Sequence, residues 1–237
     1  MPVVLLCGGK GMRLGELTHK VPKPLIPVGE RPILRHVMDI YAAQGVRRFI
    51  LCLGYKKEVV RSYFRRRTPA GWDITFLDTG LEASKSERLL RAAAHVGCDD
   101  FFIAYGDDVA DIDIRRLLAC HRRGGCPVTI TAVRLVSEFG VLRLDKGGRV
   151  TRFEEKPRLQ EWMNGGFMVA RKSIFSLLKG EFEEDVLRAL ARQGKVQAYK
   201  HRGRWKAMNT LKDYMELNRL WESGKAFWRI KEGTRHV

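Results

Sequence analysis

The sequence predicts an α/β fold in which a Rossmann-like, mixed but mostly parallel sheet is flanked by helices and carries a small antiparallel lobe. Apolar runs of strand length alternate with segments of helical period as far as about residue 126. After Pro127, short runs rich in β-branched residues are separated by glycine-rich turns. No linker or internal repeat separates these two parts of the sequence. We therefore expect a single domain over residues 1–237, with two parts of about 1–126 and about 127–237.

The first part supplies the alternation that favours a parallel sheet. One helical face collects Leu34, Val37, Met38 and Tyr41, with a proline near the start of the segment and a glycine at its end. Ligands of such sheets bind beyond the carboxyl ends of the strands. Predicted strands are Val3–Cys7, Arg48–Leu53, Asp73–Asp78 and Phe101–Asp108, and predicted helices are Pro32–Gly45, Lys57–Phe64, Ser86–Val96 and Ile112–Arg123.

The second part predicts antiparallel strands and two closing helices. The glycine turn at 146–148 is typical of a hairpin between neighbouring strands. Predicted strands are Val128–Leu135, Gly140–Leu144, Arg149–Glu155, Gly165–Ala170 and Val196–Lys200, and predicted helices are Phe182–Arg192 and Leu211–Ser223.

The charge balance indicates anionic partners. Lysine and arginine total 44 against 27 acidic residues, which gives a net charge of +17 and attracts polyanions. The sequence contains no recognition-helix motif and no zinc-finger spacing, so we expect phosphorylated small molecules and no nucleic acid. A solvated basic surface remains an alternative for part of this charge. No apolar run reaches the length of a membrane-spanning helix, so we expect no membrane partner and a cytoplasmic location.

The five cysteines (Cys7, Cys52, Cys98, Cys120 and Cys126) are odd in number and never spaced as C-x-x-C. That pattern predicts neither a disulfide framework nor a zinc site. We interpret all five as structural.

A glycine-rich segment follows the first predicted strand. Residues 8–14 read GGKGMRL, and glycines let backbone N–H groups approach phosphate oxygens closely. Lys10 and Arg13 add positive charge to this segment. It is neither a P-loop nor a true G-x-G-x-x-G, and a purely structural turn after a strand explains it equally well when it is taken alone.

Lys23 lies between two prolines in the segment VPKPLIPVG. The prolines stiffen the backbone, so the ammonium group can be directed with little loss of entropy. The alternative is an exposed lysine in an extended loop. A further segment with candidate functional side chains, Gly106-Asp107-Asp108, ends the predicted strand that begins at Phe101.

Together these segments resemble the signature of the sugar nucleotidyltransferase family. The resemblance covers residues 2 to 228, and its motifs appear in the family's order: GGKGMRL, PKPLIPVGERPIL, YGDDVADIDI, FGVLRL, FEEKP, NGGF and RWKAMNTLKDY. Within the family, YGD-x-VADIDI, EKP, NGGF and the W-x-x-M motif are most similar to the glucose-1-phosphate cytidylyltransferase branch. The resemblance implies the GT-A-like fold of these enzymes, with the nucleotide bound by residues 1–126 and the sugar phosphate by residues 127–237.

The resemblance also implies roles for individual residues. Arg13 and Lys23 would be catalytic, with Lys23 at the reacting phosphate. The metal would be Mg²⁺, held by Asp107. Nucleotide-binding positions would be Leu6, Cys7, Gly8, Gly9, Lys10, Gly11, Met12, Arg88 and Gly106, and sugar-phosphate positions would be Gly140, Glu155, Lys156 and Asn164. Phosphoryl-type transfer relies on positioning and charge neutralisation, which agrees with cations and a metal in these places.

The chain departs from the family pattern at several of these positions. Met12 replaces a hydroxyl side chain of the phosphate loop, and Asn209 replaces the second metal-binding aspartate with a neutral and poorer ligand. Asp108 replaces a glycine, so it is a candidate substitute for the lost carboxylate. The loop at 85–88 differs near the base-binding region, and only residues 65–72 fill a stretch that is longer in the branch.

Three interpretations remain open at this stage. An enzyme would make an NDP-sugar and pyrophosphate from a nucleoside triphosphate, CTP in this branch, and a hexose 1-phosphate such as glucose 1-phosphate, with Mg²⁺. A related enzyme could use another nucleotide or sugar, and a non-catalytic binding relative would explain Met12 and Asn209. A nucleic-acid-binding role explains only the charge. A homo-oligomer is compatible with each.

Overall fold

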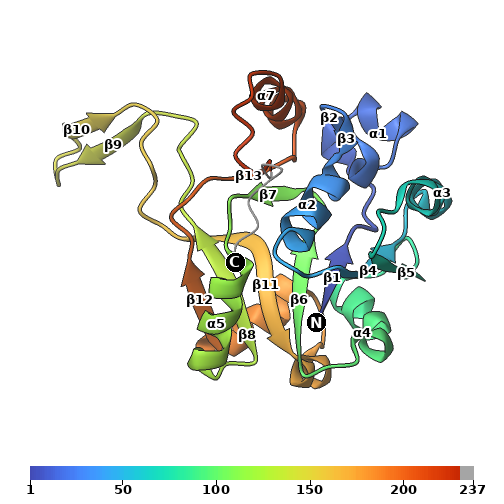
Figure 1. Ribbon diagram of the computed structural model, residues 1–237. Helices are drawn as coiled ribbons and strands as arrows, with labels where there is room; N and C mark the ends of the chain where they lie inside the picture. Colours follow the sequence, from blue (N-terminus) through green and yellow to red (C-terminus); the bar gives the residue numbers. More distant parts are fainter. Residues whose placement is uncertain (230–237) are drawn as a thin grey trace.

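The computed structural model describes residues 1–229 and is built on one mixed sheet of seven strands (Figure 1). The spatial order is β12-β8-β11-β6-β1-β4-β5. Strands β6, β1, β4 and β5 are parallel to one another, whereas β11 is antiparallel to both of its neighbours, β6 and β8, and β12 is parallel to β8. The strands are β1 (Pro2–Leu6), β4 (Arg48–Leu53), β5 (Asp73–Asp78), β6 (Asp100–Tyr105), β8 (Val128–Val133), β11 (Met163–Arg171) and β12 (Val196–Lys200).

Helices cover both faces of this sheet, as the alternation of strands and helices predicts. The α-helices are α1 (Glu16–Lys20), α2 (Ile33–Ala42), α3 (Lys57–Arg67), α4 (Lys85–Val96), α5 (Ile114–Gly124), α6 (Arg188–Arg192) and α7 (Leu211–Glu222). Short 3₁₀ segments are η1 (Met12–Leu14), η2 (Lys23–Leu25) and η3 (Lys172–Leu177), and η4 (Phe182–Leu187) is a π-helix that continues into α6. The sequence predicts one helix over Phe182–Arg192, and the structure divides it between these two forms.

The ends of two helices are set by capping boxes. The Ser84 hydroxyl accepts a hydrogen bond from the Glu87 N–H while the Glu87 carboxylate accepts one from the Ser84 N–H, and Thr210 and Asp213 repeat this exchange at α7. The structure therefore corrects the expected start of α4, whose cap is Ser84 rather than Ser86.

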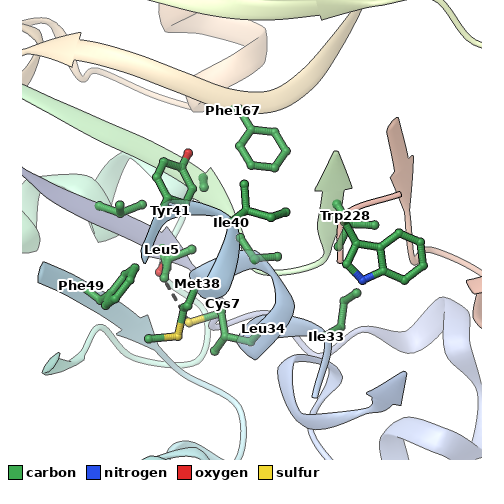
Figure 2. Close-up of a cluster of buried hydrophobic side chains, with 14 of the residues drawn as sticks. Leu5, Cys7, Ile33, Leu34, Met38, Ile40, Tyr41, Phe49, Phe167 and Trp228 are labelled. Atoms are coloured by element: carbon green, nitrogen blue, oxygen red, sulfur yellow. Dashed lines mark hydrogen bonds between the residues drawn. The ribbon is translucent and has the colours of Figure 1, made fainter. Parts of the chain in front are cut away.

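Side chains alternate across the sheet into two buried clusters. Along β1, Val3 and Leu5 belong to the cluster beneath α2, and Val4 belongs to the cluster beneath α4, η3 and η4. Figure 2 shows the first cluster, where Tyr41 of α2 lies near Phe167 of β11, with a ring-centroid distance of 5.8 Å. The central parallel strands β6, β1 and β4 are buried on both faces, which explains their continuous apolar runs.

The antiparallel part is smaller than the sequence indicates. Two of the strands expected in a separate lobe, β8 and β11, instead join the central sheet. The remaining two, β9 (Val141–Leu144) and β10 (Val150–Glu154), pair only with each other and form an arm that stands away from the body (Figure 1). Two further short pairs are β2 (Pro27–Val28) with β3 (Arg31–Pro32) and β7 (Asp108–Ala110) with β13 (Trp205–Ala207).

The fold class is confirmed by these observations. The central sheet takes strands from both expected parts of the chain, and the division near residue 126 stays a prediction. All five cysteines are free, with Cys7 and Cys52 buried. Among the helices described, none is long and apolar enough to span a membrane.

Candidate active site

A cavity of about 750 Å³ opens at the carboxyl ends of β1 and β6, where ligands of parallel sheets bind. It gathers the glycine-rich segment, the Pro-Lys-Pro segment and the acidic end of β6, which are separated by up to about a hundred residues in the sequence. Its lining includes most residues that the sequence pointed to: Leu6, Cys7, Gly8, Gly9, Lys10, Gly11, Met12, Arg13, Lys23, Arg88, Gly106, Asp107, Asp108, Asn164 and Asn209.

Two glycines of the first segment are required by close packing. A Cβ atom on Gly8 would lie 2.1 Å from Nη1 of Arg88, and one on Gly11 would lie 2.9 Å from Cβ of Lys23. Gly11 also has a φ of +68°, which side chains disfavour. Gly8 and Gly11 therefore bring the loop, Arg88 and Lys23 together, and this local fit explains the glycines at these two positions.

Arg88 supports the loop from behind. Its side chain is buried, and its guanidinium donates hydrogen bonds to the Thr79 hydroxyl at 2.5 Å, to the Gly80 carbonyl at 2.9 Å and to the Leu81 carbonyl at 3.0 Å. These bonds fix the segment after β5 against the glycine loop. Arg88 thus shapes the wall of the cavity through contacts with the protein itself.

Lys23 is the centre of the polar cluster in the cavity. Its ammonium forms an ion pair with the Asp107 carboxylate and donates a hydrogen bond to Oδ1 of Asn209 at 3.2 Å. The same Oδ1 accepts a bond from Nη2 of Arg13 at 3.3 Å. Two cations and two oxygen ligands from four separate segments therefore meet at one point. The Lys23 and Asp107 side chains are only 16% and 19% exposed, so their charges are weakly screened.

Asp108 occupies a different position from its neighbour. It is the first residue of β7 and is buried, and its Oδ2 lies within 2.0 Å of the point that a Cβ on Gly166 would occupy. Burial, followed by the negative charge of Asp107, raises the pKa of Asp108 well above the ordinary value. Asp108 thus packs against β11, whereas Asp107 contacts Lys23.

The donor set fits a divalent cation that also binds a substrate. Asp107 supplies one carboxylate and Asn209 one amide oxygen, and Mg²⁺ typically takes one or two protein carboxylates together with phosphates and water. Within residues 1–229 no group of three or more His, Cys, Asp or Glu side chains converges on a metal-sized site. Any cation held by Asp107 and Asn209 must therefore take its remaining ligands from phosphate groups and water.

A second cluster in the wall of the cavity was missed by sequence reasoning. Glu183 of η4 accepts a hydrogen bond from the Tyr105 hydroxyl and forms an ion pair with Lys85, whose Nζ lies 4.9 Å from the centre of the Tyr105 ring. The Asn164 amide approaches the Tyr105 hydroxyl at 3.4 Å. Lys85 and Glu183 are far apart in sequence, so no motif spacing could join them.

Three of the expected sugar-phosphate residues lie outside the lining of this cavity. Gly140, Glu155 and Lys156 meet at the base of the arm, where a Cβ on Gly140 would lie 3.2 Å from the Glu155 carboxylate. Glu155 and Lys156 form an exposed ion pair at 3.7 Å. Among the four expected sugar-phosphate residues, Asn164 alone lines the cavity.

Comparisons with known proteins agree on one family. A family model described as nucleotidyl transferase matches residues 2–224. A protein of Bacillus subtilis named probable glucose-1-phosphate cytidylyltransferase is 37% identical, with 97% of this chain and 100% of that protein covered. The glucose-1-phosphate cytidylyltransferase of Salmonella typhimurium is also 37% identical, over 98% of this chain and 100% of its own length.

A solved structure supports the fold alone. The crystal structure of a putative glucose-1-phosphate thymidylyltransferase from Bacillus anthracis superposes with a TM-score of 0.76 at 21% identity. The superposition covers 99% of this chain and 98% of that one.

Proposed function

Because the chain belongs to the nucleotidyl transferase family and is a nucleotidyltransferase enzyme, we propose that it makes CDP-glucose and pyrophosphate from CTP and glucose 1-phosphate. The nucleotide and sugar follow from the relatives named as glucose-1-phosphate cytidylyltransferases, which match over their whole length at 37% identity. A nucleotidyltransferase with another nucleotide or sugar specificity is the alternative.

The reaction is an in-line displacement at phosphorus. An oxygen of the sugar phosphate forms a bond to the α-phosphorus of CTP, and the bond from that phosphorus to the bridging oxygen of the β-phosphate breaks. The electron pair leaves with pyrophosphate, so atoms and charges balance. The attacking oxygen is already anionic, so the step requires no general base and depends on positioning and charge neutralisation.

Lys23 and Arg13 supply positive charge where it is needed. Both reach Oδ1 of Asn209, so their cationic groups lie within a few ångströms of one another at one point of the cavity wall. Fixed cations in a partly buried site stabilise negative charge that develops on the α-phosphate without having to reorganise. The backbone N–H groups of residues 8–11 approach the triphosphate beside them.

Asp107 and Asn209 would hold Mg²⁺, which neutralises the charge of the triphosphate when it is bound. In the free protein, Lys23 pairs with the Asp107 carboxylate and donates a hydrogen bond to Asn209. The triphosphate oxygens are negatively charged, like the Asp107 carboxylate, and therefore compete with it for Lys23. Release of Lys23 toward the phosphate frees the Asp107 carboxylate for the cation. The same residues therefore serve as internal partners in the free protein and as substrate ligands in the complex.

The sugar phosphate is assigned to the side of the cavity that carries Asn164 and Tyr105. Lys156, with Glu155 and Gly140, is the further cation assigned to it. These three residues lie at the base of the arm and outside the lining of the active-site cavity, so the base of the arm must move toward that cavity when the sugar phosphate binds.

We also assign the protein a homo-oligomeric state. On the arm, Leu144 faces Val150 and Leu142 faces Phe153, and all four side chains are exposed. A two-stranded ribbon with an uncovered apolar face is marginally stable by itself. A second copy that covers this face would stabilise the arm. Leu142→Lys should then convert the oligomer to a monomer, as measured by light scattering.

We place the enzyme in the cytoplasm, where nucleoside triphosphates occur and five free cysteines remain reduced.

The observation that carries the catalytic proposal is the convergence of Lys23 and Asp107 beside the glycine loop. The test is to incubate the protein with CTP, glucose 1-phosphate and Mg²⁺ and to quantify CDP-glucose by mass spectrometry and pyrophosphate enzymatically. Equal amounts of both products, formed on the order of 10²-fold more slowly by Lys23→Ala, support the proposal. CTP binding without either product would contradict the proposal.

A further inference from the structure

One cation in the wall of the active-site cavity has no role in the proposed reaction. Among residues 1–229, the cationic side chains that line this cavity are Lys10, Arg13, Lys23, Lys85 and Arg88. All of them except Lys85 are catalytic or nucleotide-binding positions in the family pattern. Lys85 instead begins the stretch 85–88, where the chain departs from that pattern.

Helix stability does not explain a lysine at this position. Lys85 is the first residue of α4, and the capping box of Ser84 and Glu87 fixes the start of that helix. The amino-terminal end of a helix carries partial positive charge, so a cation in the first turn is unfavourable. The position is therefore better explained by what the Lys85 ammonium contacts.

The Lys85 ammonium is held by two side chains from other segments. It forms an ion pair with Oε1 of Glu183 and lies 4.9 Å from the centre of the Tyr105 ring. The Tyr105 hydroxyl donates a hydrogen bond to the same Glu183 oxygen. An ammonium has three N–H groups, and the Lys85 side chain is 45% exposed, so it keeps donors for a ligand in the cavity.

Glu183, which positions the ammonium, is itself fixed by core packing. It belongs to the π-helix η4, in which Phe182, Val186 and Leu187 are buried in the second hydrophobic cluster. π-Helical turns are rare and occur often at functional sites. The carboxylate that orients Lys85 is therefore carried by an element that the core holds in place.

The cluster lies where the hexose ring is expected. The phosphate of the sugar phosphate must lie beside Lys23 and Asp107, where the α-phosphorus is attacked. Asn164, which is assigned to the sugar phosphate, approaches the Tyr105 hydroxyl at 3.4 Å. The hexose therefore extends from the reacting phosphate toward Tyr105 and Lys85. An ammonium beside a carboxylate offers donors next to an acceptor, and the hydroxyl groups of a sugar both donate and accept.

We propose that Lys85 is a specificity-determining residue whose ammonium, positioned by Glu183 over the Tyr105 ring, donates a hydrogen bond to a hydroxyl group of the hexose. This inference rests on the proposed function and adds to it a residue that selects among hexose 1-phosphates. A sugar that lacks this hydroxyl, or carries it on the other face of the ring, leaves the Lys85 donor without its partner and is a poorer substrate.

The test combines substitution of Lys85 with removal of single hydroxyl groups from the substrate. kcat/KM is measured at saturating CTP and Mg²⁺ for glucose 1-phosphate and for four analogues, each of which lacks one hydroxyl group of the hexose. In the wild type, loss of the contacted hydroxyl should reduce kcat/KM on the order of tenfold or more, because the hydrogen bond involves a charged donor. Lys85→Met should show a loss of that size with glucose 1-phosphate and no further loss with that one analogue.

Lys57→Met is the matched control. Lys57 is the first residue of α3, forms an ion pair with Asp78, is exposed to a similar degree as Lys85, and lies outside the lining of the active-site cavity. This variant removes the same charge from an equivalent helix position. It should reproduce the wild-type values with all five sugars.

Three results would overturn the inference while the proposed function stands. A Lys85→Met enzyme that matches the wild type with glucose 1-phosphate would reduce Lys85 to a structural ion pair. An equal loss with all five sugars would show that the ammonium binds the phosphate or only supports the cavity. A raised KM for CTP with unchanged values for the sugars would place Lys85 at the nucleotide. If the wild type does not turn over glucose 1-phosphate with CTP, the proposed function itself fails, and this inference fails with it.

Discussion

Lys23→Ala removes the cation at the centre of the active-site cluster. The lysine side chain is 16% exposed, and its ammonium contacts Asp107 and Oδ1 of Asn209, so truncation removes a positive charge that solvent does not replace. Loss of one preorganised donor to a developing negative charge costs about 10²–10³ in kcat, or about 2.7–4 kcal/mol. We expect a loss in this range. The KM for glucose 1-phosphate should change little, because Lys23 is assigned to the α-phosphate of the nucleotide.

The assay is steady-state pyrophosphate release with each substrate varied at saturating concentrations of the other. Lys10→Ala is a suitable control, because Lys10 lines the same cavity but is 44% exposed and pairs with the exposed Glu82 at 2.8 Å. Such a surface pair contributes little, so kcat of this variant should stay within about fivefold of the wild type. A Lys23→Ala enzyme with near-normal kcat would refute the reasoning and reduce the Pro-Lys-Pro segment to a structural role.

Three further predictions concern the metal, the sugar phosphate and the buried histidine. Asn209→Asp should lower the Mg²⁺ concentration needed for half activity, because it adds a carboxylate ligand. Asp108→Gly should leave that concentration unchanged, because Asp108 packs against β11. If Asp108→Gly raises it and the added substitution Asn209→Asp restores it, Asp108 replaces the lost carboxylate. Lys156→Ala should raise the KM for glucose 1-phosphate and leave kcat unchanged; an unaltered KM would remove Lys156 from the site. Burial lowers the pKa of His36 below its ordinary 6.5, so the unfolded chain is protonated first and the melting temperature should fall as the pH drops below about 6.5. His36→Gln, which keeps an N–H donor for the Val28 carbonyl, should flatten that dependence in thermal melts from pH 5 to 8.

Local sequence patterns were sufficient for the parallel half of the fold. β4 and β5 have the bounds that their apolar runs predict, because each run is bounded by polar or glycine residues; β4 is buried from Phe49 to Leu53, and the edge strand β5 is half-buried along its four central residues. The predicted helix at Ser86–Val96 starts one residue later than α4, because the capping residue is Ser84, whose partner Glu87 is the third helical residue.

The antiparallel half was harder to predict because its strands are sorted by long-range pairing. β8 and β10 both begin with Val-Thr, yet β8 lies between β11 and β12 in the central sheet and β10 pairs only with β9. Composition determines that a segment forms a strand and does not determine which partner it meets.

The site was predicted through motifs, and its geometry required the structure. The resemblance to nucleotidyltransferases pointed to Lys23, Asp107 and Asn209, and all three meet in one cavity. Two facts had no local signal: Arg88 donates hydrogen bonds to the carbonyl groups of residues 80 and 81, and Glu183 contacts both Lys85 and Tyr105. Both depend on segments that approach each other only in the folded protein.

The most direct test of the proposed activity is the specificity of the forward reaction. The measurement is kcat/KM for CTP, UTP, GTP, ATP and dTTP with glucose 1-phosphate and Mg²⁺, followed by pyrophosphate release. We expect CTP to have the highest value by at least about tenfold, which corresponds to about 1.4 kcal/mol of transition-state discrimination. A higher value for any of the other four nucleotides, or no pyrophosphate with any of the five, would contradict the proposal that this chain is a glucose-1-phosphate cytidylyltransferase.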